Sequence, residues 1–203
     1  MRLKQLEMAL QRLAGFPHPR ASLEQYQTPA PLAARLLYHA CSKGDIREKS
    51  VCDLGSGTGM LAIGAILLGA RRVLGVEIDP AAVAVAVENT TLLDAGVEFI
   101  VSDVRDEALG GNLGPFDTVV MNPPFGAQMA HADRPFIDCS LRIAPITYGI
   151  FNAGSTPFIE AYVAGRATID EHVSGIFPIR RMFAFHKKDL QEIEVEILRL
   201  VRN

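Results

Sequence analysis

The sequence has little that would hold the chain in a membrane, cross-link it or attract it as a whole to nucleic acid. Tryptophan is absent, and the three cysteines, Cys41, Cys52 and Cys139, form no C-x-x-C pair. Such scattered thiols favour a reducing compartment over a disulfide framework. The longest apolar stretch, residues 60–70, is too short to span a bilayer. With a formal net charge of −3, any binding of nucleic acid must come from local basic patches.

Other common features are missing as well. The five histidines show no metal-ligand spacing, so we expect no metal site. Residues 1–7 carry mixed charge and do not have the apolar core of a signal peptide. We therefore expect a soluble, cytoplasmic protein that does not contact a membrane. Its 203 residues predict one domain over 1–203, with 1–45 forming an N-terminal helical extension packed on it.

Strand-like and helix-like patterns alternate along the chain, which favours a parallel β-sheet with helices on both faces. The last two strand-like runs follow each other closely and predict an antiparallel hairpin at a sheet edge. The expected fold class is α/β: a Rossmann-like, mostly parallel seven-stranded sheet with an antiparallel C-terminal edge hairpin and N-terminal helices. The expected strands are 50–54, 72–78, 97–101, 116–121, 147–152, 172–178 and 193–202, and the expected helices are 2–14, 31–41, 60–68, 80–95, 135–145 and 157–167.

A glycine-rich loop joins the strand 50–54 to the helix that follows it. Gly55, Gly57 and Gly59 allow the backbone to pass close under a ligand, with the amides of the helix N-terminus facing that ligand. Dinucleotide dehydrogenases carry G-x-G-x-x-G at this place, whereas the spacing here is G-x-G-x-G. The loop therefore favours a nucleotide-like ligand but disfavours a nicotinamide-dependent oxidoreductase.

Acidic residues surround this loop. Glu77 ends the second strand, where a carboxylate can accept both ribose hydroxyls of a nucleoside. Asp103 follows the third strand and either accepts a ligand's adenine amine or caps its loop. Asp53 either orients the loop amides, meets the positive end of a ligand, or is a buried structural carboxylate. Asp79 is the expected N-cap of the helix 80–95, and Gly96 is its expected C′ residue.

Asn122-Pro123-Pro124-Phe125 follows the strand 116–121 and carries the chemistry. The Asn122 side-chain oxygen and the Pro123 carbonyl can accept both hydrogens of an exocyclic adenine amine, whose lone pair is otherwise delocalised into the ring. The prolines fix φ and hold the carbonyl in place, and Phe125 offers a face to an extruded base. The alternative interpretation is a simple turn that closes the strand.

Together these motifs resemble the class I S-adenosylmethionine-dependent methyltransferases of the amino-methylating type, whose hallmarks are D-L-G-x-G-x-G, a strand-ending acid and N-P-P-F. The segment LEQYQT at 23–28 is similar to the E-Q-Y-x-T segment of the archaeal and eukaryotic small-subunit rRNA adenine-N6 methyltransferases. FHKK at 185–188 and IEVE at 193–196 resemble the C-terminal motifs of that family. The resemblance covers nearly the whole chain.

The resemblance implies S-adenosyl-L-methionine as cofactor and methylation of N6 of one adenine in small-subunit rRNA. It places part of the cofactor site in the segment before the second helix and the rest at the strand ends, with the target base at the Asn-Pro-Pro-Phe motif. The implied cofactor residues are Gln25, Tyr26 and Thr28 at the methionine moiety, Gly55 and Gly57 beneath the cofactor with Asp53 before them, Glu77 and Ile78 at the ribose, Asp103 and Val104 at the adenine ring, and Asn122. The implied catalytic residues are Asn122, Pro123, Pro124 and Phe125.

The expected partner is structured rRNA. A sequence-specific DNA methylase would carry a separate target-recognition domain, whereas an RNA fold can present its adenine already unstacked. The loop 126–134 matches the family poorly, and its role in RNA binding stays open. The basic residues form an expected RNA surface between the last two strands, although a solvated hairpin is the alternative; they are Arg180, Arg181, His186, Lys187 and Lys188.

The strand 97–101 is a second candidate interface. In the strand order expected from the resemblance it lies at the open edge of the sheet, and it contains no Pro or Lys to discourage pairing. Eukaryotic relatives are stabilised by a small zinc-binding activator protein on the sheet edge, so the resemblance implies a similar partner on 97–101. Self-association through this edge, or shielding of the strand by another part of the chain, is the alternative.

Two other functions stay open. Methylation of a protein glutamine amide poses the same chemical problem, but such enzymes usually end the motif in Tyr and carry a longer N-terminal helical domain. A non-catalytic module that only binds the cofactor is also conceivable, although an intact Asn122-Pro123-Pro124-Phe125 motif speaks against it.

Overall fold

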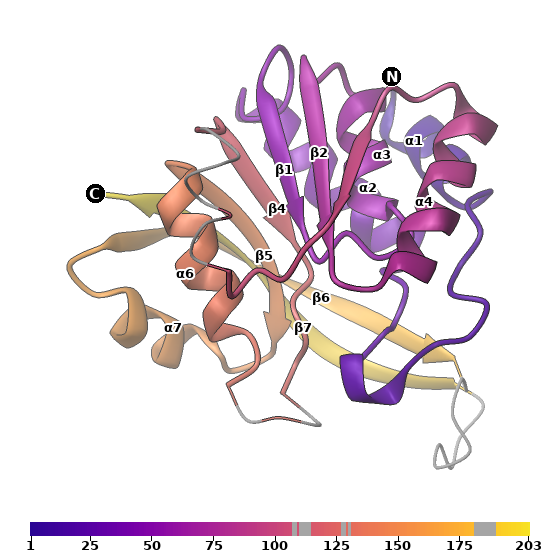
Figure 1. The fold of residues 1–203 in the computed structure, drawn as a ribbon. Helices are drawn as coiled ribbons and strands as arrows, with labels where there is room; N and C mark the ends of the chain where they lie inside the picture. Colours follow the sequence, from indigo (N-terminus) through magenta and orange to yellow (C-terminus); the bar gives the residue numbers. More distant parts are fainter. Residues whose placement is uncertain (107–108, 110–114, 127–128, 130, 181–189) are drawn as a thin grey trace.

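A central β-sheet organises the molecule. The computed structural model describes residues 1–106, 109, 115–126, 129, 131–180 and 190–203. Seven strands lie in the spatial order β3-β2-β1-β4-β5-β7-β6 (Figure 1). The first five pair in parallel, and β7 runs antiparallel to both of its neighbours, which confirms the predicted fold class. The strands are β1 (Ser50–Leu54), β2 (Arg72–Glu77), β3 (Glu98–Val101), β4 (Thr118–Met121), β5 (Ile146–Asn152), β6 (Ala167–Arg180) and β7 (Leu190–Arg202).

Helices cover both faces of the sheet (Figure 1). Successive residues of a strand point to opposite faces, so Val51 of β1 packs with the helices of one face and Cys52 with those of the other. The central strands are apolar on both faces, as expected of a parallel sheet buried on both sides. The first face carries α1 (Leu3–Leu10), α2 (Ala30–Ser42), α3 (Met60–Leu67) and α4 (Pro80–Leu93), and the second carries α6 (Arg134–Ile143) and α7 (Thr156–Val163).

Several predicted boundaries were wrong. The helix predicted over 2–14 ends at Leu10, and α7 ends at Val163. α4 ends at Leu93 because Asp94 adopts the left-handed conformation, with φ 50°, so Gly96 is not the residue that terminates it. Aspartate tolerates this conformation better than most residues, and a sequence reading that looks first for glycine overlooks it.

The C-terminal hairpin was predicted too short. β6 and β7 pair from Ala167 with Arg202 to Arg180 with Leu190, well beyond the predicted 172–178 and 193–202. β6 continues past Pro178, because it lies at the sheet edge, where a proline is tolerated. Residues 181–188, which contain most of the predicted basic RNA surface, lie outside the described residues. Residues 127–128 and 130 of the loop 126–134 lie outside them as well.

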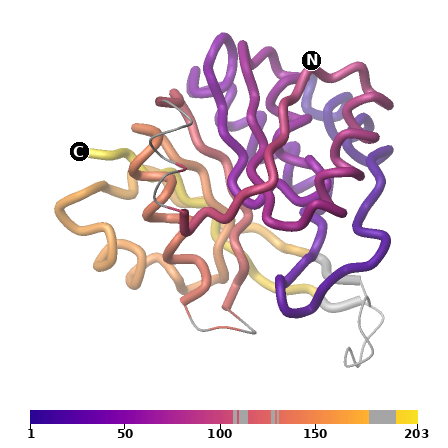
Figure 2. Tube along the Cα trace, viewed as in Figure 1, coloured from indigo at the N-terminus to yellow at the C-terminus, as the bar shows by residue number. Residues whose placement is uncertain are grey.

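The segment between α1 and α2 places the N-terminal region over the functional end of the sheet. It contains the short 3-10 helix η1 (Ala21–Leu23), and its trace runs past the ends of the central strands (Figure 2). Several of its residues share a cavity with residues that directly follow β1, β2 and β4. Within the described residues, no helix is long and apolar enough to cross a membrane.

Candidate active site

A cavity of about 270 Å³ opens at the carboxyl ends of β1, β2 and β4. Ligands of open α/β sheets bind at this end of the strands. All predicted site residues line it except Pro123 and Phe125. The predicted residues on the cavity wall are Gln25, Tyr26, Thr28, Asp53, Gly55, Gly57, Glu77, Ile78, Asp103, Val104, Asn122 and Pro124.

The glycine-rich loop forms the floor of the cavity. Gly55 and Gly57 have φ of 71° and 52°, in the left-handed region. A Cβ atom on Gly55 would come within 2.8 Å of the Phe136 ring, and one on Gly57 within 2.8 Å of the Phe16 ring. Both rings also line the cavity, so any larger residue in the loop would displace its walls.

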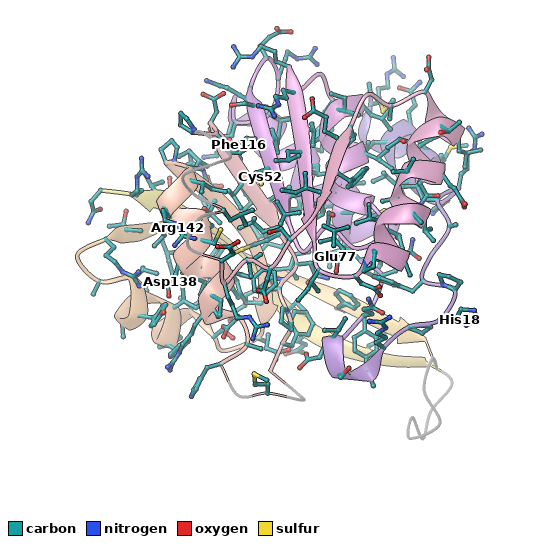
Figure 3. All side chains as sticks on the ribbon, in the orientation of Figure 1. His18, Cys52, Glu77, Phe116, Asp138 and Arg142 are labelled. Atoms are coloured by element: carbon teal, nitrogen blue, oxygen red, sulfur yellow. The ribbon has the colours of Figure 1, made fainter. Side chains whose placement is uncertain are left out.

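Glu77 ties this loop to the end of β2. Its Oε2 accepts a hydrogen bond from the Gly57 amide at 2.8 Å, and its Oε1 accepts one from the Asp79 amide at 2.9 Å. Burial raises the pKa of the carboxyl, and these amide bonds oppose the shift. Each oxygen retains a lone pair for a ligand hydroxyl. Figure 3 labels Glu77 at the end of the strand, as the sequence predicted.

Asp53 is fully buried beneath the cavity. Its Oδ2 accepts a hydrogen bond from the Ala62 amide at 2.8 Å, in the first turn of α3, and not from the glycine-rich loop as expected. Its Oδ1 has no partner within the described part of the chain. Burial raises the pKa of Asp53 to about 8, and the negative charge of Glu77 adds to this effect. A cationic ligand nearby would favour the ionised form.

The segment 20–28 is fastened to the site by hydrogen bonds of Gln25. Gln25 Nε2 donates to Asp79 Oδ2 at 2.8 Å, and Gln25 Oε1 accepts from the Arg20 amide at 2.7 Å. Asp79 also accepts from the Ala81 amide at 3.1 Å, which confirms it as the N-cap of α4. The Gln25 amide therefore holds the segment on α4 while its side chain lines the cavity.

The Asn-Pro-Pro-Phe turn contacts the same segment at two points. Asn122 Nδ2 donates to Thr28 Oγ1 at 3.0 Å, which fixes the amide plane. Its Oδ1 is buried and accepts no hydrogen bond within the described residues. The Phe125 amide donates to Glu24 Oε2 at 2.7 Å. The sequence predicted the acceptor role of Asn122, but it gave no partner for either group.

Phe125 is not among the residues that line the cavity. Its ring packs edge-on against Phe177 of β6, with 5.7 Å between ring centroids, and its carbonyl accepts a hydrogen bond from Asn152 Nδ2 at 3.2 Å. The side chain therefore anchors the turn to the C-terminal hairpin. Its predicted contact with the target base stays a prediction.

Asp103 is already engaged by a cation. Arg105 Nε lies 2.9 Å from Asp103 Oδ2, and the Arg105 amide donates to Asp103 Oδ1 at 2.9 Å. The hydrogen bonds of the guanidinium lower the pKa of this carboxyl. Beside it Val104 is buried, and Ile78 is 42% exposed. An adenine amine at Asp103 would share the carboxylate with Arg105.

The wall of the cavity carries more negative than positive charge. Its described lining residues include four carboxyl groups and a single arginine, Arg105, which is paired with Asp103. Such a wall favours a ligand that carries positive charge together with hydroxyl and amine donors. The four acids are Glu24, Asp53, Glu77 and Asp103.

Sequence reasoning missed three aromatic residues of the wall: Phe16, His131 and Phe136. Phe136 belongs to the first turn of α6, and His131 precedes that helix with φ 64°. No local pattern marks these rings as part of the site, because they reach it only through the packing of α6 and of the segment after α1.

Comparisons with known proteins agree with this geometry. A family model described as ribosomal protein L11 methyltransferase (PrmA) matches residues 35–123. The rRNA N(6)-adenosine-methyltransferase Mettl5 of Drosophila melanogaster is 35% identical, over 98% of this chain and 96% of its own. Its counterpart in Danio rerio is 31% identical over 98% of both chains. The chain belongs to the rRNA N(6)-adenosine-methyltransferase family.

A solved structure is similar to this chain over its whole length. The crystal structure of a proposed RNA methyltransferase from Pyrococcus horikoshii is 40% identical and superimposes with a TM-score of 0.91, over 100% of this chain and 98% of the other. The likeness therefore includes the segment before α2 and the C-terminal hairpin as well as the methyltransferase core.

Proposed function

We propose that this chain transfers a methyl group from S-adenosyl-L-methionine to the exocyclic N6 amine of an adenosine in small-subunit rRNA. The observation that carries the proposal is the Asn122 amide, whose nitrogen is held by Thr28 while its buried oxygen has no partner within the described residues. An unsatisfied buried acceptor is costly. A target amine that enters the cavity supplies the missing donor.

The residues of the cavity fit the cofactor. The loop at Gly55 and Gly57 leaves no room for side chains, Glu77 retains lone pairs for ribose hydroxyls, and Asp53 keeps an unpaired oxygen. When bound, S-adenosyl-L-methionine supplies an electrophilic methyl group on a positively charged sulfur. The acidic wall favours that charge and the ammonium group of the methionine part.

The Asn-Pro-Pro turn prepares the nucleophile. Asn122 Oδ1 accepts one hydrogen of the amine, and we assign the second to the Pro123 carbonyl. Two acceptors outside the plane of the base favour a pyramidal nitrogen with an available lone pair. The Glu24 bond to the Phe125 amide keeps the turn in this position. Fixed acceptors of this kind need no reorganisation during the reaction.

Methylation of a protein side chain is the second candidate, because the family model of a ribosomal protein methyltransferase matches residues 35–123. That match ends within the Asn-Pro-Pro-Phe motif and leaves out residues 1–34 and the C-terminal hairpin. The two rRNA methyltransferase relatives cover 98% of the chain. The regions that surround the shared core therefore support RNA as the substrate.

A direct assay separates these substrates. The protein is incubated with labelled S-adenosyl-L-methionine and, separately, with small-subunit rRNA, DNA and ribosomal protein, and the methylated product is identified by mass spectrometry. We expect N6-methyladenosine in the RNA sample, and none with Asn122→Ala. Label in the protein sample alone would overturn the proposal.

We also propose that a small zinc-binding activator protein adds a strand to β3. β3 has one neighbour, β2, and lies at the sheet edge, and its Val101 is 54% exposed. An open edge strand is a template for β-augmentation. Hydrogen exchange should show slower exchange of amides in 97–101 when the partner is added. Unchanged exchange in an active complex would contradict this docking mode.

We place the enzyme in the cytoplasm. Cys41, Cys52 and Cys139 are all free thiols, which suits a reducing compartment. Fluorescence microscopy of a tagged chain in its own cell type should show diffuse cytoplasmic signal, and a signal confined to another compartment would contradict the proposal.

A further inference from the structure

A row of aromatic rings leads away from the cavity along α7. His131 lines the cavity, and its ring stacks on Phe158 at 6.1 Å with an interplanar angle of 25°. Phe158 in turn stacks on Tyr162 at 5.7 Å and 22°. Phe158 and Tyr162 are four residues apart and therefore share one face of the helix. The row begins at the active site and continues across the surface between α6 and α7.

Two arginines accompany this row. The Arg134 guanidinium lies 5.1 Å from the Phe158 ring centroid and 5.3 Å from that of Tyr162, and Arg166 lies 5.0 Å from Tyr162. All three distances are in the range of a cation–π contact. We call these five residues the α6–α7 ladder: His131, Arg134, Phe158, Tyr162 and Arg166.

The two arginines differ in their partners. Arg166 Nη1 donates to Asp138 Oδ1 at 2.7 Å, and the Tyr162 hydroxyl donates to the same carboxylate; Figure 3 labels Asp138 on α6. The Arg134 guanidinium makes no ion pair or hydrogen bond with any other described residue, and its Nε is buried without a partner. Arg134 is therefore held in place by rings and keeps its charge available.

The ladder lies at the edge of the core, where Phe158 and Tyr162 pack against it with one part of their rings. The core side of α7 is provided by Ile159 and Val163, which are buried with the residues of the second face of the sheet. Phe158 and Tyr162 lie only partly buried beside them, and His131 is exposed. Stacked rings with an unpaired cation at a half-exposed surface match the chemistry of single-stranded nucleic acid recognition.

The charge of the cavity explains why such a surface is required. Glu24 and Glu77 on its wall repel the phosphates of an RNA strand that must bring a base into it, whereas Asp103 is already paired with Arg105. A cation next to the cavity can hold those phosphates, and Arg134 lies there without a counter-ion among the described residues. The ladder therefore offers positive charge and a stacking surface on the side of the cavity formed by the turn before α6.

We propose that the α6–α7 ladder binds the nucleotide next to the target adenosine, with its base on the His131 ring and its phosphate at Arg134. This inference rests on the proposed RNA substrate and deepens it. It makes His131 and Arg134 positioning residues for the RNA strand, with no role in binding the cofactor.

The test uses His131→Ala and Arg134→Gln, with Arg142→Gln as matched control. Arg142 is an exposed arginine in the last turn of the same helix and belongs to neither cavity nor ladder. RNA affinity is measured by fluorescence anisotropy on an rRNA hairpin, cofactor affinity by calorimetry, and folding by thermal unfolding. We expect either ladder variant to weaken RNA binding about tenfold, since one base stack is lost or one phosphate contact removed. Cofactor affinity should stay unchanged, and the unfolding temperature should fall by no more than a few degrees, since the lost ring contacts are each weak.

Two further readouts separate this role from a structural one. The slope of log Kd against log salt should fall by about 0.7 for Arg134→Gln and stay unchanged for Arg142→Gln, as expected for one phosphate contact on a single strand. Stacking on His131 is tested with two RNA hairpins that lack one base, either on the 5′ or on the 3′ side of the target adenosine. The wild-type protein should bind one of these abasic hairpins about tenfold more weakly than the intact hairpin. The His131→Ala variant should bind that abasic hairpin and the intact hairpin with equal affinity.

The outcomes also distinguish this inference from the proposed function. RNA that is bound and methylated equally by wild type and both ladder variants would overturn the ladder and leave the function standing. A wild type that neither binds nor methylates any RNA would overturn both. A loss of unfolding temperature that accounts for the weaker binding of both variants would also reject the ladder as an RNA surface.

Discussion

The two halves of the cavity are built in different ways. The part that would receive the ribose is made of segments that directly follow β1 and β2, and Glu77 contacts the Gly57 and Asp79 amides across 20 and 2 residues. The target half depends on contacts between distant segments. Thr28 holds Asn122 across 94 residues, and Glu24 holds Phe125 across 101.

This difference separates binding of the cofactor from orientation of the target amine. Local loops at strand ends can form a cofactor site as soon as the parallel strands are paired. The acceptors of the target half reach their geometry only when the segment 20–28 has closed over the sheet. We therefore expect changes in the first half to act on cofactor affinity and changes in the second half to act on turnover.

The strongest test of this comparison is Asn122→Ala. Removal of the acceptor should lower kcat by a factor on the order of 100 to 1,000, similar to the loss of one transition-state hydrogen bond. Cofactor affinity should stay nearly unchanged, because the interaction forms with the target amine. Single-turnover kinetics and calorimetry measure the two quantities. Near-normal turnover in a folded variant would refute the role of the Asn-Pro-Pro turn.

Glu77→Ala tests the opposite half. The variant loses hydrogen bonds of a charged acceptor to the ribose, each worth about 1.5–3 kcal/mol, so the Kd for S-adenosyl-L-methionine should rise by at least tenfold. Turnover at saturating cofactor should change much less. Glu77→Gln serves as the matched variant, since it keeps an acceptor for the Gly57 amide. If calorimetry finds wild-type affinity for both, the carboxylate is only structural.

Glu24→Gln makes a smaller change in the target half. The amide oxygen can still accept from Phe125, but the bond loses its charge assistance, worth roughly 1 kcal/mol. We expect a fall in kcat of about fivefold, with a smaller change in cofactor affinity from the lost charge of the wall. Glu24→Ala should lower kcat further, and a shift in cofactor Kd without loss of kcat would show that the two halves are not separate.

The smallest effect concerns the pH dependence of stability. Because the pKa of Asp53 is raised to about 8 in the fold, the folded protein holds a proton that the unfolded chain has lost, and stability falls as pH rises from about 4 to about 8. Asp53→Asn keeps an acceptor for Ala62 and removes this penalty. Its unfolding temperature without cofactor should exceed that of wild type by a few degrees near pH 8 to 9, and the gain should vanish towards pH 4. A constant difference across this range would contradict the shifted pKa.

The same division explains what the sequence could predict. Gly55, Gly57 and Glu77 are recognisable because strand, loop and acid occur in one short stretch, and all three line the cavity. The acceptor role of Asn122 follows from its motif. Its partner Thr28, and the partner Glu24 of the same turn, could not be predicted, because these contacts form only when distant segments pack together. The same holds for Phe16 and Phe136, and for Asp94, which ends α4 in a conformation that favours glycine.

The place of β7 in the sheet has a consequence for synthesis of the protein. β7 lies between β5 and β6 and pairs Ile146 with Val201, so β5 has an open edge until residue 201 has left the ribosome. Val195, Ile197, Leu198 and Leu200 of this strand are buried, which means that neither core can close in the nascent chain before β7 has been synthesised. Chains folding this late expose apolar strands during translation, and a ribosome stalled shortly before β7 would carry a chain that depends on chaperones to remain dispersed.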